Sequence, residues 1–278
     1  MPTLAIRQAP AVIDMLFASQ PRLLSLHDSP LHGVGVRAEI SFEKDDVVLM
    51  ENPLYFLQTM PNRKHCILCA TCLRPLGNMS VQLGVLQGLL SRENIHTDHA
   101  EYPPLQEEHS VQHASQIVPC TTGCGELYCC VECRDRHWTA KGHRLLCTGS
   151  ISEDEASDHP LICFKVHAIT TNEIFLMVAE VFASMCCQAD TLISTGMSAH
   201  EALHICIQPL SGYVRELWWK AAVPPKGSKP IAFRNSLKAL VSESWSLLND
   251  ALQLQAKGYS AVLSEEYMSR YELYWTVC

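Results

Sequence analysis

The chain has 278 residues, of which 47% are hydrophobic and 18% charged, so it has room for one large domain or two modest ones. Its net charge of −8 argues against a protein that binds nucleic acid over its whole surface. The N-terminus lacks the basic-then-apolar run of a secretory signal peptide. The longest apolar run, 174–187, is interrupted by Glu180 and Ser184 and is shorter than the roughly 20 residues that cross a bilayer. We therefore expect a buried helix there and no membrane contact.

The chain opens with a helical pattern that gives way to strand patterns. Three apolar residues at helical spacing before a proline predict a helix within residues 1–30; they are Ile13, Leu16 and Phe17. Apolar residues then alternate with others around 34–38, which predicts a strand. A turn is predicted at 43–46, followed by a second strand at 47–50. Together these segments predict a β-hairpin.

Residues 73–119 divide into two parts. Residues 81–90 are apolar and predict a helix. Residues 94–116 contain proline and glutamate without apolar periodicity, which predicts a flexible loop. This loop carries four histidines, namely His96, His99, His109 and His113. Because nothing fixes their relative positions, we assign them no metal.

Cysteines are concentrated between residues 120 and 147, where 28 residues hold six of the fourteen cysteines and two histidines. The short-spaced pairs in this segment are Cys120 with Cys124, Cys129 with Cys133, and His143 with Cys147. A Zn²⁺ ion takes four such ligands at tetrahedral corners, so three pairs cannot close two sites. Upstream, the segment HCILCATC supplies Cys66, Cys69 and Cys72 as two overlapping pairs. Eight ligands would then complete two closed zinc sites.

Disulfide bonds are the main alternative for these cysteines. They need an oxidising compartment, which the lack of a signal peptide disfavours. With eight ligands assigned, Cys66 and Cys130 are spare, and His137 is predicted to lie on the surface or beside a ligand. Spacing alone leaves open whether Cys66 replaces Cys69 or Cys72.

A basic cluster accompanies the cysteines; it comprises Arg134, Arg136, Lys141 and Arg144. Zinc–thiolate sites carry net negative charge, and nearby cations offset it. We therefore interpret the cluster as a solvated face beside the zinc sites. Contact with DNA phosphates is the weaker interpretation, because the whole chain is acidic.

The C-terminal half has mainly helical patterns. Residues 148–160 form an acidic stretch, predicted to be a mobile linker. Residues 159–187 predict one or two helices, with Thr171 or Asn172 as an N-cap. A short amphipathic helix is predicted at 211–222. A long helix is predicted from about residue 235, with its core stripe at Leu237, Leu240, Val241, Leu248 and Leu252.

The cysteine-rich segment resembles a MYND finger at YCCVEC, Trp138 and the pair His143-x3-Cys147. That family interleaves its ligand pairs between two zinc ions. The resemblance implies one site formed by Cys69, Cys72, Cys129 and Cys133, and another formed by Cys120, Cys124, His143 and Cys147. Two features depart from the family pattern: the three residues between Cys120 and Cys124, and the 47 residues between Cys72 and Cys120. Both departures concern how the pairs are shared between the two sites, and the zinc chemistry of the ligands is unaffected.

The segment before the finger resembles the opening of a SET domain. It reads GVGVRA, then the predicted hairpin and a strand that precedes Pro53. In that family the Gly-x-Gly backbone lies against S-adenosylmethionine, because glycine permits close approach of the main chain. The resemblance therefore implies that Gly33, Val34 and Gly35 bind this cofactor. An ordinary β-hairpin is the alternative.

Later segments, TNEIFLMVAEVFA, YVRELWW, LVSESWSLLN and SEEYMSR, are similar to a plant-type branch of the SET- and MYND-domain protein-lysine methyltransferases. The resemblance extends from about residue 30 to 270. It implies an α+β fold with N-terminal SET strands, an inserted two-zinc MYND finger and a helix-rich region. The implied parts are an N-terminal helix (1–30), SET strands (31–65), the finger with its insert (66–147), an acidic linker (148–160), a helical SET-insert region (161–270) and a divergent tail (271–278).

Two motifs of that family are missing. No asparagine precedes a histidine, so the Asn-His-Ser-Cys-x-Pro-Asn motif is absent, and no Gly-Glu-Glu occurs. Tyr271 and Tyr274 have no surrounding pattern that supports a catalytic role, so we assign no catalytic residue. We expect a truncated family member with an incomplete SET domain that does not methylate by itself.

The resemblance implies S-adenosylmethionine-dependent methylation of a lysine on a protein or histone substrate, carried out by the complete protein. The alternative is a protein-interaction module in transcriptional regulation, in which the finger binds a peptide partner. Either function places the protein in the nucleus, the cytoplasm or both.

Overall fold

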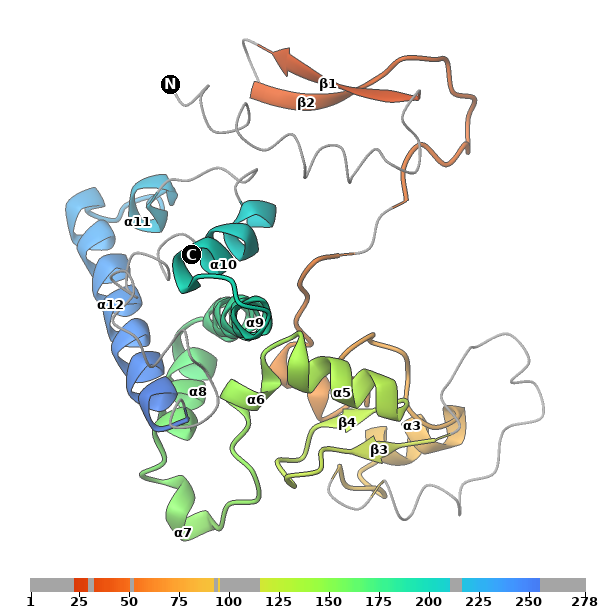
Figure 1. Ribbon diagram of the computed structural model, residues 1–278, viewed down its shortest axis with the longest axis vertical. Helices are drawn as coiled ribbons and strands as arrows, with labels where there is room; N and C mark the ends of the chain where they lie inside the picture. Colours follow the sequence, from red (N-terminus) through yellow and green to blue (C-terminus); the bar gives the residue numbers. More distant parts are fainter. Residues whose placement is uncertain are drawn as a thin grey trace.

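The structure is a computed structural model that describes residues 23–29, 33–50, 53–92, 95, 116–210 and 217–255. Within these ranges it contains a β-hairpin, a cysteine-rich unit with a second small sheet, and a group of helices (Figure 1). This mixture of helices and small sheets agrees with the coarse expectation of an α+β protein. The predicted insert loop lies almost entirely outside the described residues, and the predicted tail lies wholly outside them.

The N-terminal hairpin consists of β1 (Leu24–Ser29) and β2 (Gly33–Ala38). The two strands are antiparallel, and Leu24 lies opposite Ala38. In Figure 1 the hairpin lies apart from the described helices and from the cysteine-rich unit. The strand β1 corrects the prediction of a helix over 1–30, whose first 22 residues lie outside the described part. The residues that carry the helical spacing, Ile13, Leu16 and Phe17, lie outside the described part, so the helix itself stays a prediction.

The predicted turn at 43–46 is present, but the predicted second strand is not. The amide of Asp46 donates to the carbonyl of Glu43 at 3.2 Å, and Asp45 adopts a positive φ of 73°. Residues 47–50 have no regular structure. The partner of β2 is β1 instead, and no described strand pairs with 47–50, whose side chains are exposed. An apolar run without a partner strand does not form a sheet.

The cysteine-rich unit, residues 66–92, 95 and 116–147, contains short elements around its own apolar core. Its elements are α3 (Met79–Leu86), β3 (Val118–Pro119), β4 (Leu127–Tyr128), α5 (Val131–Thr139) and α6 (His143–Leu146), and α2 (Met60–Arg63) precedes them. The helix predicted at 81–90 is α3, which begins and ends earlier. Its start is fixed by the N-cap Asn78, whose side chain accepts a hydrogen bond from the Val81 amide. Ile67, Leu76 and Tyr128 are completely buried in this core.

The helical group follows in sequence. It consists of α7 (Glu153–Ala156), α8 (Pro160–Thr171), α9 (Ile174–Ser194), α10 (Ala199–Ile207), the 3-10 turn η3 (Gln208–Leu210), α11 (Trp218–Ala221) and α12 (Pro230–Gln255). Helix α9 lies in the middle of this group, beside α8 and α10 and against α6 of the cysteine-rich unit (Figure 1). Its buried residues, including Phe175, Phe182 and Met185, form the main core with residues of α8, α10 and α12.

The helices predicted within 159–187 and from about residue 235 are confirmed in outline and differ in detail, whereas half of the helix predicted at 211–222 lies outside the described residues and α11 covers four of the rest. The 159–187 segment forms two helices, and the break is fixed by Asn172, whose side chain accepts from the Ile174 amide at 3.1 Å. Glu173 occupies the N-cap position instead of Thr171 or Asn172. Helix α12 begins earlier than predicted, at Pro230, a residue well suited to the first turn. The acidic linker contains α7, whose Ser152 and Glu155 form a capping box.

Helix α9 has 21 residues and is apolar enough to cross a membrane by length and composition, and 56% of its most apolar window is buried inside the protein. A single helix of this kind is weak evidence for a membrane span, since the core helix of a soluble protein passes the same test. Helix α9 continues about two turns beyond the apolar run 174–187 for which a buried helix is predicted. Its packing against α8, α10 and α6 is that of a core helix.

Candidate metal centres

The first group of metal-binding side chains joins two distant segments. Its members are Cys69, Cys72, Cys129 and Cys133, whose sulfur atoms all lie within 4.8 Å of one another. The Sγ atoms of Cys72 and Cys129 are 3.6 Å apart, and those of Cys129 and Cys133 are 3.5 Å apart. Cys69 and Cys72 lie in the turn closed by the Leu68–Pro75 bridge, and the other two lie at the start of α5.

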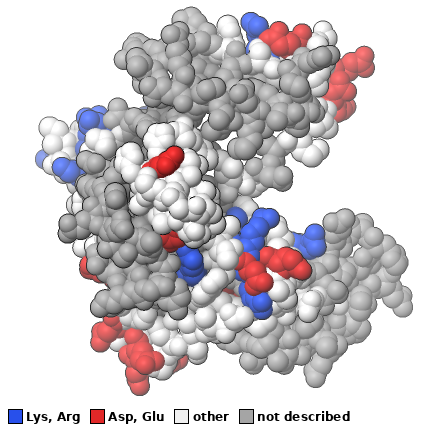
Figure 2. Space-filling view, in the orientation of Figure 1, with Lys and Arg blue, Asp and Glu red and all other residues white. Residues whose placement is uncertain are grey.

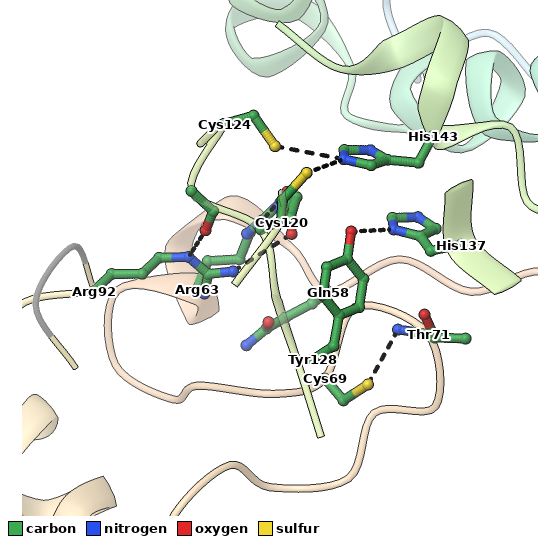
Figure 3. Close-up of polar contacts among 12 residues, drawn as sticks. Gln58, Arg63, Cys69, Thr71, Arg92, Cys120, Cys124, Tyr128, His137 and His143 are labelled. Carbon is green, nitrogen blue, oxygen red and sulfur yellow. Dashed lines mark hydrogen bonds and ion pairs between the residues drawn. The ribbon is translucent and has the colours of Figure 1, made fainter. Parts of the chain in front are cut away.

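The second group mixes sulfur and nitrogen. Its members are Cys120, Cys124, His143 and Cys147, again with ligand atoms within 4.8 Å of one another. The Nε2 atom of His143 is 3.4 Å from the sulfur atoms of both Cys120 and Cys124 (Figure 3). The sulfur atoms of Cys120 and Cys147 are 3.9 Å apart. Both groups have the membership that the family resemblance implies, including the interleaving of pairs.

These distances fit zinc. With Zn–S bonds of about 2.3 Å and Zn–N bonds of about 2.0 Å, tetrahedral geometry places two sulfur ligands about 3.8 Å apart and a sulfur and a nitrogen about 3.5 Å apart. The observed separations of 3.5–3.9 Å between sulfur atoms and 3.4 Å between sulfur and Nε2 are close to these values. Soft thiolates and imidazole are the ligands that Zn²⁺ prefers. Each group can therefore hold one zinc ion.

Backbone and hydroxyl groups orient the thiols. The amide of Thr71 donates to the Cys69 sulfur at 3.5 Å, while the Thr71 hydroxyl donates to the Cys133 carbonyl at 2.7 Å and ties the two segments together. In the second group, the Thr122 hydroxyl lies 2.9 Å from the sulfur of Cys147. Hydrogen bonds from Cys124 and then His143 lower the pKa of the Cys147 thiol, which favours the thiolate that binds Zn²⁺.

His137 supports the second group without belonging to it. Its ring stacks on that of His143 with centroids 4.6 Å apart and an interplanar angle of 5°. Its Nδ1 atom is 2.9 Å from the hydroxyl of Tyr128 (Figure 3). The sequence predicts His137 either on the surface or beside a zinc ligand. In the structure His137 is buried and lies beside the ligand His143. The spare cysteines Cys66 and Cys130 belong to neither group.

A charged cluster lies beside Cys124. Glu126 accepts from Arg63 at 2.6 Å and pairs with Arg92 at 3.4 Å. Burial by itself would raise the pKa of Glu126, but the two guanidinium groups outweigh it and lower the pKa to about 2. The cluster connects α2 and the segment after α3 to the β3–β4 hairpin. It therefore braces the loop that carries Cys124.

Part of the predicted basic face is not solvated but docks the cysteine-rich unit on α9. Arg144 donates to Asp190 at 2.9 Å and to the Cys187 sulfur at 3.0 Å, and Lys141 lies 3.7 Å from Glu180. The solvated interpretation is therefore wrong for Lys141 and Arg144, because carboxylates of α9 lie opposite them. Arg134 pairs with its neighbour Asp135. Figure 2 shows basic and acidic side chains intermixed over this part of the surface.

Glu180 gives the docking contact a pH dependence. Burial raises the pKa of Glu180 to about 7, against the opposing effect of Lys141. Between about pH 5 and pH 7 the folded chain holds a proton there that the unfolded chain has released, so stability falls as the pH rises. We expect the free energy of unfolding to fall by up to about 3 kcal/mol across this window relative to Glu180→Gln. Urea titrations at pH 5, 6, 7 and 8 measure this difference, and parallel curves for the two proteins would contradict it.

The residues predicted to bind S-adenosylmethionine stand apart from both groups. Gly33, Val34 and Gly35 lie on β2. Gly35 is exposed, and a Cβ atom built on it would meet nothing within 4 Å. The described residues therefore form no closed cofactor pocket around Gly35, and the cofactor role of these three residues stays a prediction.

No protein-family model and no solved structure matches the chain. The chain is 26% identical over 270 residues to a curated protein of Arabidopsis thaliana, the histone-lysine N-methyltransferase ATXR2. The match covers 79% of this chain, which spans 56% of the length of that relative. It supports the methyltransferase resemblance at the coarse level. The chain is thus distantly similar to a plant histone-lysine methyltransferase, and it contains two groups of residues that can each hold zinc.

Proposed function

We propose that the cysteine-rich unit is a two-zinc MYND finger and that the chain is the finger-bearing part of a SET-type, S-adenosylmethionine-dependent protein-lysine methyltransferase. The observation that carries this proposal is the interleaved geometry of the two ligand groups. The similarity to a histone-lysine methyltransferase supports the link to methyl transfer and to a protein or histone substrate. The eight group members are the proposed zinc ligands.

In this proposal, Gly33, Val34 and Gly35 contact the cofactor in the complete enzyme. Methyl transfer needs a closed site that aligns the sulfonium methyl with a neutral amine. The sequence lacks both the Asn-His-Ser-Cys and the Gly-Glu-Glu motifs, and Gly35 is exposed. We therefore propose that this chain alone binds the cofactor weakly and transfers no methyl group.

Two measurements on the zinc-loaded chain test this proposal. Titration calorimetry with S-adenosylmethionine is expected to give a Kd weaker than about 1 mM, or about −4 kcal/mol. Ultraviolet cross-linking at millimolar cofactor, with S-adenosylhomocysteine as competitor, is expected to label the peptide that contains residues 33–35. Binding near 1 μM, about −8 kcal/mol, would contradict the proposed inactivity. Competed labelling elsewhere would contradict the cofactor assignment.

The alternative proposal is a protein-interaction module in transcriptional regulation. A small cavity of about 90 Å³ beside the second ligand group supports it; Tyr128, Arg134 and Trp138 border this cavity together with Cys120 and His143. Aromatic and arginine side chains are enriched where proteins bind peptides. A proline-containing peptide that binds wild type but not Trp138→Ala, with zinc content unchanged in both, would favour this function. Either function is compatible with the nucleus or the cytoplasm, which we retain as the proposed location.

A further inference from the structure

A cavity of about 880 Å³ lies between the cysteine-rich unit and the helical group, beside the place where the two are in contact. Most of its wall is apolar, and both sides contribute side chains, among them Leu68 of the cysteine-rich unit and Phe164 and Leu176 of the helical group. Its size lies in the range of cavities that hold small organic molecules. Such a space between two packed units is where ligand sites are commonly found.

One polar pair in this wall is incomplete. The Nζ atom of Lys141 lies 3.7 Å from Oε1 of Glu180, which is too long for a hydrogen bond. Neither atom has a hydrogen-bond partner among the described residues, although the two side chains are only 13% and 15% exposed. The other close contact of the ammonium group is the ring of Phe56, with Nζ 4.1 Å from its centroid. A buried donor and a buried acceptor without partners are costly.

The remaining charges of the cavity do not call for an ionic ligand. Arg63 and Arg92 are engaged by Glu126. Lys64 is exposed and Lys165 is half-buried at the edge of the cavity. Cys69, Cys124 and His143 also border the cavity, and zinc–thiolate groups there would offset positive charge. A neutral ligand group matches this balance best.

We propose that this cavity binds a mostly apolar molecule that carries a carboxamide. The carbonyl oxygen of the ligand accepts a hydrogen bond from Lys141, and its amide N–H donates one to Glu180. The apolar body of the ligand fills the cavity between α8 and the cysteine-rich unit. No bond is made or broken. This site is separate from the residues assigned to S-adenosylmethionine, so it stands or falls independently of the proposed methyltransferase link.

Three probes with the same ring test the proposal: 1-naphthaleneacetamide, 1-naphthaleneacetate and 1-naphthylmethylamine. Ligand-observed NMR titrations of the zinc-loaded chain are run at pH 8, where Glu180, with a pKa of about 7, is mainly ionised. The amide is expected to bind about tenfold more tightly than either charged probe, because it alone satisfies both Lys141 and Glu180. Equal binding of the three probes, or no binding of the amide, would overturn the proposal.

Variants place the bound amide in the cavity. Lys141→Met and Glu180→Leu are each expected to weaken amide binding about tenfold, whereas Lys238→Met on the exposed side of α12 leaves it unchanged. Zinc content and the unfolding temperature verify that each variant is folded. If a variant at the pair fails to fold, Ile169→Trp serves instead, since Ile169 borders the cavity and is 39% exposed. Unchanged amide affinity in a folded cavity variant would contradict the assignment.

Discussion

Cys129→Ser is expected to lose at least one of the two zinc ions per chain and to unfold the part of the cysteine-rich unit around the first ligand group, while Cys130→Ser keeps both ions. Cys129 belongs to the first ligand group, and its sulfur lies within hydrogen-bonding distance of both Cys72 and Cys133. Cys130 is its immediate neighbour in sequence but belongs to neither group. Structural zinc contributes about 10–16 kcal/mol to folding. That is as large as the roughly 5–15 kcal/mol by which whole domains are stable, so loss of the site is expected to unfold the structure around it.

Elemental analysis after gel filtration gives the zinc content of the two variants. Amide NMR spectra then report whether the residues around Ile67 and Leu76, in the core of this unit, keep their dispersed signals. Because the two substitutions are the same and adjacent, general oxidation or purification losses affect both. Two zinc ions in Cys129→Ser, or one in Cys130→Ser, would contradict the ligand assignment.

Gly142→Ala is expected to cost the folded protein at least about 2 kcal/mol by separating the cysteine-rich unit from α9. Gly142 has a φ of 80°, and a Cβ atom there would lie 2.5 Å from the backbone of Ala183 and Ser184. The clash falls where the Ser184 hydroxyl donates to the carbonyl of Ala140 at 2.7 Å. Neither backbone can move without disturbing the packing of α9.

The matched control is Gly227→Ala. Gly227 has a φ of 85°, and a Cβ atom there meets nothing within 4 Å, so this variant carries the backbone strain without the clash. Urea unfolding of both variants isolates the contribution of the close approach. Equal destabilisation would mean that the docking of the unit on α9 does not depend on Gly142.

The ligand residues were predictable because zinc chemistry imposes short local spacings on a sequence. The pairs at Cys120, Cys129 and His143 follow from that rule alone. The choice of Cys69 and Cys72 over Cys66 came from the family resemblance, because the segment LRPL that follows Cys72 fits the family's first ligand pair. In the structure this pair reaches Cys129 and Cys133 through a turn that local sequence does not specify.

Tertiary contacts explain what the sequence did not reveal. Residues 24–29 form a strand because they pair with β2. Residues 47–50 form no strand because no described strand lies beside them to pair with. The pairs Lys141–Glu180 and Arg144–Asp190 join segments far apart in the chain, so no local pattern announces them. Helix α10 was missed although a signal was present, since Ser198 followed by Glu201 is a typical helix start.

Zinc stoichiometry combined with X-ray absorption at the zinc edge tests the central claim most directly. The seven cysteines and one histidine of the two groups predict two zinc ions per chain with an average of 3.5 sulfur and 0.5 nitrogen ligands each. The expected bond lengths are about 2.3 Å to sulfur and about 2.0 Å to nitrogen. Fewer than two ions, oxygen ligands in place of sulfur, or disulfide-linked cysteines in the freshly purified chain would contradict two closed zinc sites.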